Sequence, residues 1–379
     1  MMTNKKYDAV IAGYTCVDLI PAFKKHKAAG NINDILKPGK LIEIEGLDFV
    51  LGGLVPNTGL AMKKFGKNVY LNGLLGNDSI GRIAAEKFRD YGIHEGILSV
   101  DDAGTAYSVV LAPPGVDRIF LESPGCNQIF DKSHIDFEKA GMARLFHFGY
   151  PPLLKQFIIN GGDQLVSMYS EVQKTGVITS LDLSLPDPDS EAGKVNWPEI
   201  MKATLPFVDI FVPSLEELLA VIAPDKYKEL KDRAADSDII DIVPENLIRE
   251  TGEEIIKSGV KILMIKMGKR GIYLLTGDAS SAIINSRLSN TDWNNREIWC
   301  NAYPADPSKM KHASGAGDTA VSAFLSAVLD GESPESAIKY AAAAGRDKLY
   351  CDDIYEDIPD WNRLSGEISR EINELIILK

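Results

Sequence analysis

Short runs of apolar residues alternate along the chain with segments whose apolar residues recur at the spacing of an α-helix. Polar or glycine-containing residues follow each run, as expected for a buried strand that ends in a turn. Strands that alternate with helices are typical of a mostly parallel sheet with helices on both faces. The pattern therefore predicts an α/β fold, with strands at residues 8–12, 69–74, 145–148, 177–181, 209–212 and 261–266.

Two helices are predicted clearly by this spacing. Residues 80–91 place their apolar side chains on one helical face, and Gly92 follows as a stop signal. A second apolar stripe covers residues 321–329, where interleaved alanines permit close packing. Ser333-Pro334 marks the start of the next helix, because serine caps helix N-termini and proline suits the first turn.

Three segments have the alternation of exposed or half-buried strands instead. They are residues 41–51, 105–111 and 118–122, and turn residues such as Pro113-Pro114-Gly115 separate them. Because these strands do not belong to the strand–helix alternation, we expect them to form a small sheet that stands apart from the large one.

Two further segments have the character of insertions. Residues 225–241 carry many charges and predict a solvated surface element. Residues 285–311 are polar and include Trp293 and Trp299, which either cover a bound base or pack in a core or interface. Composition alone assigns no function to these two segments.

Composition and charge narrow the class of protein. The chain has 379 residues, of which 45% are hydrophobic and 25% charged, and these values exclude a disordered or fibrous protein. The net charge of −13 leaves no basic face for phosphate backbones, so we expect no nucleic-acid partner. No apolar run approaches the ~20 residues that cross a bilayer, so we expect no membrane association.

The cysteines and histidines do not form a metal site in the sequence. The four cysteines lie far apart without a C-x-x-C pair, and the five histidines follow no ligand spacing. We interpret the cysteines as buried free thiols of a protein in a reducing compartment, which favours a cytoplasmic location.

The segment just before the helix at 321–329 carries the strongest chemical signal. Small residues at Gly315, Ala316 and Gly317 leave the first N–H groups of the helix open to a ligand, and the helix dipole favours an anion there. Asp318 follows in the first turn, where a carboxylate is able to accept a proton from a hydroxyl group. The alternative interpretation is a glycine-rich turn in which Asp318 merely caps the helix.

A second glycine-rich segment lies near the N-terminus. Gly52 and Gly53 permit close approach of the backbone to a ligand, and Asn57 offers both a donor and an acceptor. A similar turn, residues 76–81, follows a predicted strand. Each of these turns is common on its own, so the signal lies in their combination with residues 315–318.

Together these segments resemble, in order and spacing, the signatures of the ribokinase-like (PfkB) carbohydrate kinase family. The resemblance runs from Gly13 to about Ala344. It implies a three-layer α/β/α fold with a mostly parallel central sheet, and one kinase domain over residues 1–379. It also implies a small β-sheet lid formed by about residues 14–51 and 105–123. Further matching motifs lie at residues 124–127, 213–217 and 266–271.

The family resemblance implies that the γ-phosphoryl group of ATP, with Mg²⁺, is transferred to a hydroxyl group of a sugar or sugar-like molecule. It implies catalytic roles for Asp318 as the base and for Gly315, Ala316 and Gly317 as the anion cradle. The residues that it implies for the sugar are Asp18, Gly52, Gly53, Asn57 and Asn127. Those that it implies for the nucleotide are Lys266, Gly268, Gly271 and Ser314, and those for the metal are Glu217, through water, and Asp182.

The sequence departs from the family pattern at His312, Ser214, Ser184 and Cys16, which argues against ribokinase itself. Two alternatives stay open: a nucleoside kinase of the same fold, and a catalytically silent sensor that binds a sugar or nucleotide. A dinucleotide oxidoreductase is excluded because residues 13–18 lack the second and third glycines of its fingerprint. The expected partners are a small sugar, ATP and, through an exposed lid edge, a second copy of the chain.

Overall fold

The computed structural model describes residues 5–23, 35–113, 119–235, 237–279, 293–351, 353–370 and 373–378. Its main feature is a ten-stranded sheet in the order β14-β13-β12-β11-β10-β9-β8-β1-β4-β5. Strand β1 (Tyr7–Gly13) lies between β4 (Val69–Gly76) and β8 (Ala143–Gly149), and β5 (Ile97–Val100) forms one edge. The neighbouring strands β9 (Ile178–Asp182), β10 (Ile210–Phe211) and β11 (Ile262–Lys266) are also parallel. All six predicted strands are therefore confirmed.

Three antiparallel strands complete the other edge of the sheet. They are β12 (Ile272–Thr276), β13 (Glu297–Cys300) and β14 (Leu375–Ile377). The interpretation of residues 285–311 as an insertion was wrong for this part, because β13 belongs to the main sheet; residues 285–292 lie outside the described residues. Trp293 and Trp299 pack against Phe324 and Tyr273, so both are packing residues.

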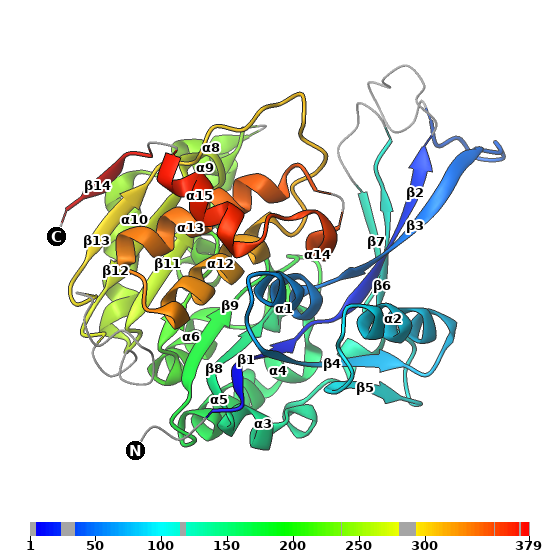
Figure 1. Ribbon diagram of the computed structural model, residues 1–379, viewed down its shortest axis with the longest axis horizontal. Helices are drawn as coiled ribbons and strands as arrows, with labels where there is room; N and C mark the ends of the chain where they lie inside the picture. The colour runs from blue at the N-terminus through cyan, green and yellow to red at the C-terminus, as the bar shows by residue number, and fades with distance from the viewer. Residues whose placement is uncertain are drawn as a thin grey trace.

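Helices cover both faces of the sheet, as predicted (Figure 1). Side chains that alternate along each strand enter two separate hydrophobic clusters: Ile11 lies in one and Val10 in the other. The first cluster includes residues of α1 (Leu54–Lys64), α2 (Ser79–Asp90), α12 (Ala316–Asp330), α13 (Pro334–Lys348) and α15 (Trp361–Arg370). The second includes residues of α3 (Phe137–Gly141), α4 (Lys155–Ile158), α5 (Asp163–Gln173), α6 (Trp197–Thr204), α7 (Leu215–Ile222), α8 (Pro224–Ala234), α9 (Ile239–Ile242) and α10 (Glu245–Lys257).

The predicted helices and the charged segment are found where the sequence places them. Helices α2 and α12 contain the two apolar stripes, and the Ser333 hydroxyl caps α13 by accepting a hydrogen bond from the Ser336 N–H group. Residues 225–241 contribute to α8 and α9, whose surface is largely exposed apart from anchors such as Leu230. None of the described helices has the length and apolar character that crossing a bilayer requires.

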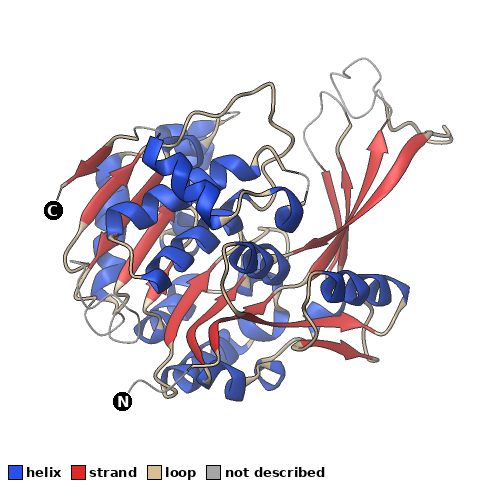
Figure 2. Cartoon of the chain, viewed as in Figure 1, coloured by secondary structure: helices blue, strands red, loops and turns tan. Residues whose placement is uncertain are grey.

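A separate four-stranded sheet projects from the large one (Figure 2). Its order is β3-β2-β6-β7, with β2 at Cys16–Phe23, β3 at Ile44–Gly52, β6 at Tyr107–Leu111 and β7 at Ile119–Ser123. Strands β3, β6 and β7 match the predicted exposed strands, whereas β2 was not predicted as a strand. Gly53 alone separates β3 from α1, so this small sheet and the main body meet at that residue.

Candidate active site

Helix α12 begins with an open turn. Gly315 is the N-cap residue and has the left-handed backbone conformation, with φ 74°. Neighbouring side chains already occupy the space that a side chain on it would need. The left-handed φ favours glycine there, and a Cβ at Gly315 would also press on Cδ1 of Ile354, 2.8 Å away. Ala316 and exposed Gly317 follow; the Ala316 N–H group donates a hydrogen bond of 3.2 Å to the carbonyl oxygen of Ala313, and Gly317 has no side chain that would cover the helix start. The residues predicted as the anion cradle thus form one helix N-terminus.

Asp318 lies in this first turn, and two side chains from distant parts of the chain hold its carboxylate. Its Oδ2 accepts a hydrogen bond of 2.9 Å from Nδ2 of Asn57 in α1, and its Oδ1 accepts one of 2.7 Å from the hydroxyl of Tyr150, the residue after β8. Only 3% of Asp318 is exposed. Burial and the neighbouring Asp182 raise the pKa of Asp318 to about 6, against the opposing effects of Tyr150, Lys266 and Asn57. The carboxylate is therefore a stronger base than an exposed aspartate, yet is ionised at neutral pH.

An ion pair lies beside this carboxylate. The ammonium of Lys266, at the end of β11, donates hydrogen bonds of 2.7 and 2.8 Å to the two carboxylate oxygens of Asp182, at the end of β9. Asp182 is fully buried. Burial alone would lower the pKa of Lys266, but the carboxylates of Asp182 and Glu217 raise it, so the side chain stays charged. The prediction assigned Lys266 to the nucleotide and Asp182 to the metal, and it did not foresee that they pair.

Glu217 lies in the same charged cluster and also shapes the start of α7. Its Oε2 accepts a hydrogen bond of 2.7 Å from the N–H group of Ser214, while the Ser214 hydroxyl accepts one of 3.3 Å from the Glu217 N–H group. This reciprocal pair is a capping box, which fixes the glutamate against the helix start. Burial raises the pKa of Glu217 to about 7, although Lys266 opposes the shift.

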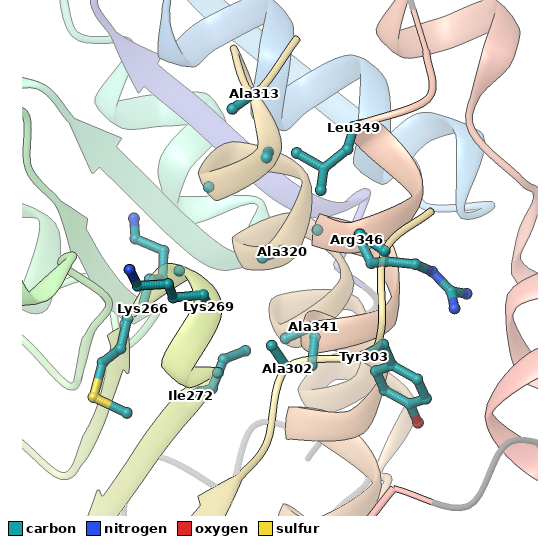
Figure 3. A pocket seen from close by; sticks show the side chains of 18 of the residues that line it. Lys266, Lys269, Ile272, Ala302, Tyr303, Ala313, Ala320, Ala341, Arg346 and Leu349 are labelled. Carbon is teal, nitrogen blue, oxygen red and sulfur yellow. The ribbon is translucent and has the colours of Figure 1, made fainter. Parts of the chain in front are cut away.

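A cavity of about 580 Å³ opens next to the anion cradle (Figure 3). One wall is the turn between β11 and β12, with Lys266, Gly268 and Gly271. A Cβ at Gly271 would lie 2.0 Å from the carbonyl oxygen of Cys300, so glycine is required there. Small residues of α12 and α13 form the facing wall, namely Ala316, Gly317, Ala320, Ala341, Ala342 and Gly345. Three of the four predicted nucleotide residues line this cavity, whereas Ser314 lies beside it.

The residues predicted for the sugar gather where the small sheet meets the main body. A Cβ on Gly52 would lie 2.8 Å from Oδ2 of Asp18, and one on Gly53 would lie 2.8 Å from the ring of Tyr14. The Tyr14 hydroxyl donates a hydrogen bond to the carboxylate of Glu122 in β7. Asp18 and Gly52 are diagonal neighbours on the paired strands β2 and β3, since Gly52 pairs with Cys16 and Asp18 with Val50, and this pairing brings together residues that are far apart in the sequence.

Asn127 differs from the other residues predicted for the sugar, because both polar atoms of its side chain bond to the backbone. It is fully buried; its Nδ2 donates a hydrogen bond of 2.9 Å to the carbonyl of Thr15, and its Oδ1 accepts one of 3.4 Å from the Thr15 N–H group. In this structure Asn127 therefore fixes the backbone between β1 and β2. That backbone leads directly to Asp18.

Three side chains of the site were not predicted, namely Tyr14, Glu122 and Tyr150. Tyr150 and Tyr14 each follow a central strand, at the carboxyl end of the sheet where ligands bind in open α/β folds, and this position was the available signal. Their rings lie 6.4 Å apart and join the neighbourhood of Asp318 to that of Glu122. Glu122 had no local signal, because it lies in a strand whose three central residues are all exposed.

The whole chain has relatives of known family. A model of the pfkB family carbohydrate kinases matches residues 7–349. Fructokinase-1 of Oryza sativa subsp. japonica is 24% identical over 305 residues, which cover 78% of this chain and 80% of that protein. The 5-dehydro-2-deoxygluconokinase of Clostridium perfringens is 21% identical over 392 aligned residues, 98% of this chain and 95% of that protein.

Solved structures agree in fold. The structure of Arabidopsis thaliana ribokinase complexed with ribose and ATP matches with a TM-score of 0.69 at 19% sequence identity. The match covers 96% of this chain and 99% of that chain. At this identity the likeness concerns the fold, which confirms the expected three-layer architecture with its separate small sheet.

Proposed function

Because the chain belongs to the pfkB family of carbohydrate kinases, it is a sugar kinase, a phosphotransferase with an alcohol acceptor, and we propose that it transfers the γ-phosphoryl group of ATP through Asp318 and the anion cradle. The observation that carries this proposal is the position of Asp318: its buried carboxylate lies in the first turn of α12, directly after the cavity-lining residues Ala316 and Gly317, and it accepts hydrogen bonds from Asn57 and Tyr150. The acceptor is a hydroxyl group of a sugar or sugar-like molecule.

In the proposed reaction Asp318 removes the proton of the acceptor hydroxyl as its oxygen attacks the γ-phosphorus atom, and the bond from that phosphorus to the β,γ-bridging oxygen breaks, so that ADP leaves. Asn57 and Tyr150 hold the carboxylate by hydrogen bonds to both of its oxygens, which fixes its direction before the substrate arrives. The N–H groups of the cradle, residues 315–317, then stabilise the charge on the migrating phosphoryl group. Positioning and charge stabilisation are the main contributions that phosphoryl transfer requires.

We propose that the 580 Å³ cavity holds the nucleotide, with its triphosphate directed toward the cradle. Gly268 and Gly271 shape the wall beside the base and ribose, and the small residues of α12 and α13 leave room for a flat ring. Lys266 supports this placement because its Nζ lies 3.8 Å from the position of a Cβ on Gly317, next to the cradle. Its ammonium is thus near enough to the transferred group to offset part of its charge.

The arrangement of acidic groups near the cradle favours a Mg²⁺ ion that would be bound mainly through phosphate oxygens and water. Among the described residues, no three histidine, cysteine, aspartate or glutamate side chains converge on a ready-made metal site. Magnesium usually keeps several waters and takes only one or two carboxylates. Glu217 fits this role through water, whereas both oxygens of Asp182 are bonded to Lys266. When bound, the ion would neutralise charge on the triphosphate.

We propose that the small sheet is a lid over the acceptor and that Asp18, Gly52, Gly53 and Asn57 bind the sugar. The carboxylate of Asp18, in β2, lies beside Gly52, where the small sheet meets the main body. A residue that binds the hydroxyls of a sugar under the lid would need to lie at this place. Water exclusion by such a lid would limit hydrolysis of ATP. Asn127 then supports the site by holding the backbone at Thr15.

The lid supports a proposal about partners, and the cysteines support one about location. Its outer strands expose large apolar side chains, including Leu47 at 57% and Leu121 at 54%, so we propose that lids of two copies pair. Sedimentation velocity over a range of concentrations tests this pairing. The four cysteines are free and buried, which supports the cytoplasmic location.

The function is tested by release of ADP from ATP and Mg²⁺ across a panel of acceptors. The panel contains ketoses, aldoses, sugar acids, inositols and nucleosides, because the named relatives include a fructokinase and a 5-dehydro-2-deoxygluconokinase. We expect one acceptor class to stimulate ADP release, and Asp318→Asn to lower kcat by about 10²–10⁴-fold. A silent panel with retained nucleotide binding would favour a sensor, and a near-normal rate for the variant would exclude Asp318 as the base.

A further inference from the structure

A buried lysine lies directly behind the anion cradle. Lys348 is the last residue of α13, and only 1% of its surface is exposed. Its Cε atom lies 3.6 Å from the position that a Cβ on Gly315 would occupy, so the side chain extends to the residue that caps α12. Lysine is rarely buried so completely unless its charge is used or balanced. A cation at this place adds to the positive end of the α12 dipole.

The structure holds this ammonium in position from the α13 side. Its Nζ donates a hydrogen bond of 3.0 Å to the carbonyl oxygen of Cys351, and the C-terminal end of a helix favours a cation. The Cys351 thiol donates in turn to the carbonyl oxygen of Asp347, at 3.2 Å. These bonds tie the turn at residues 348–351 to the end of α13.

Ile354, a few residues after this turn in the sequence, also lies against Gly315. Ile354 begins α14 (Ile354–Asp357), and its Cδ1 is the atom that a Cβ on Gly315 would meet at 2.8 Å. The Asp353 side chain caps α14 and accepts a hydrogen bond of 2.8 Å from the hydroxyl of Tyr91, beside α2. A side chain on Gly315 would therefore meet Ile354, Lys348 and Nδ2 of Asn57, the last of these at 3.6 Å, so these three residues crowd the same side of the helix start.

We propose that Lys348 is a positioning residue for phosphoryl transfer, which fixes the turn at 348–351 against Gly315 and adds a positive charge behind the amides of the cradle. This inference rests on the proposed function, because it assumes that the cradle receives a phosphoryl group. Lys348 does not contact the substrate in this proposal; it acts through Gly315. The turn that it holds extends past residue 349, where the family match ends.

The test compares Lys348→Met, which keeps the length of the side chain and removes its charge, with Lys348→Arg, which keeps the charge. Lys257→Met is the matched control, because that lysine side chain is 74% exposed and lies on α10. For Lys348→Met we expect kcat to fall by about 10–100-fold while KM for the sugar changes less than about twofold, since small displacements of catalytic groups are costly. Lys348→Arg should keep most of the wild-type rate.

A binding measurement separates this role from a general loss of structure. Calorimetry with adenosine 5′-(β,γ-imido)triphosphate and Mg²⁺ should show affinity about tenfold weaker in Lys348→Met, because a nearby charge has been removed. Adenosine, which lacks phosphates, should bind both proteins equally. Equal losses for both ligands, or wild-type affinity and kcat in a folded Lys348→Met, would overturn the proposal. If Lys348→Met does not fold, an inactive but folded Lys348→Arg would also overturn it.

The failure of this inference and the failure of the proposed function give different results. If the wild-type protein phosphorylates no acceptor, the kinase proposal fails, but the comparison of the two nucleoside ligands still measures the effect of Lys348 on the cradle. A protein that turns over its sugar while Lys348→Met binds the triphosphate analogue normally would retain the proposed function and lose this inference.

Discussion

The hydrogen bond from Tyr150 to Asp318 gives a prediction with a defined pH signature. Tyr150→Phe keeps the ring, which packs 6.4 Å from that of Tyr14, and removes only the donor to Oδ1 of Asp318. A hydrogen bond to a charged group contributes about 1.5–3 kcal/mol, and about 1.4 kcal/mol corresponds to one pH unit in a titration midpoint. Because Asn57 still donates to Oδ2, we take the lower part of this range.

The expected result is a displaced acidic limb in the dependence of kcat/KM on pH. The wild-type limb should have its midpoint near the pKa of Asp318, about 6, and the variant limb about one pH unit higher. At pH 6 the ionised fraction of the base then falls about fivefold, whereas at pH 8 the two enzymes should differ by less than about threefold.

The measurement is ADP release at pH 5–9 with both proteins, at low and at saturating concentrations of ATP. The stability of each protein is checked over the same range, so that inactivation is not mistaken for titration. An unchanged midpoint would contradict the assignment of Asp318 as the titrating base. A loss of equal size at every pH would show that the hydroxyl of Tyr150 acts by placement and not by stabilising the carboxylate.

Two other predictions concern stability and ligand binding. Burial raises the pKa of Asp318 from 3.8 to about 6, so the folded protein loses stability as the pH rises through that window. Asp318→Asn should therefore raise the free energy of unfolding by up to about 3 kcal/mol at pH 8 and by almost nothing below pH 4. Urea unfolding at both pH values measures this difference. Asp18→Ala should weaken sugar binding with little change in nucleotide binding by calorimetry, and the reverse pattern would contradict its placement on the sugar side.

The parallel part of the fold was predictable because its strands are buried on both faces. Such strands are nearly continuous apolar runs, as in 145–148 and 261–266, and the helices between them have a regular stripe. The antiparallel edge was not predicted, because β14 is a three-residue strand whose partner lies far away in the sequence. Strand β2 contains Asp18 and Pro21, which obscure its alternation.

The anion cradle and Asp318 could be proposed from the sequence because these four residues, 315–318, are consecutive. The groups that tune it are not local: Tyr150 lies 168 residues from Asp318, and Lys266 lies 84 residues from Asp182. Sequence reasoning assigned Lys266 and Asp182 to different ligands, because nothing in their separate motifs shows that they pair. Only the order of β9, β10 and β11 in the sheet brings them together.

The residues that surround the carboxylate of Asp318 come from regions that are distant along the chain. Its helix lies in the last quarter of the sequence, while Asn57 is 261 residues earlier and Tyr150 is 168 residues earlier. If the chain is cut or misfolded in any of these regions, the Asp318 carboxylate loses at least one of the contacts that hold it in place. Turnover by this enzyme is therefore a sensitive reporter of complete folding, and it should disappear before circular dichroism registers a change in helix content.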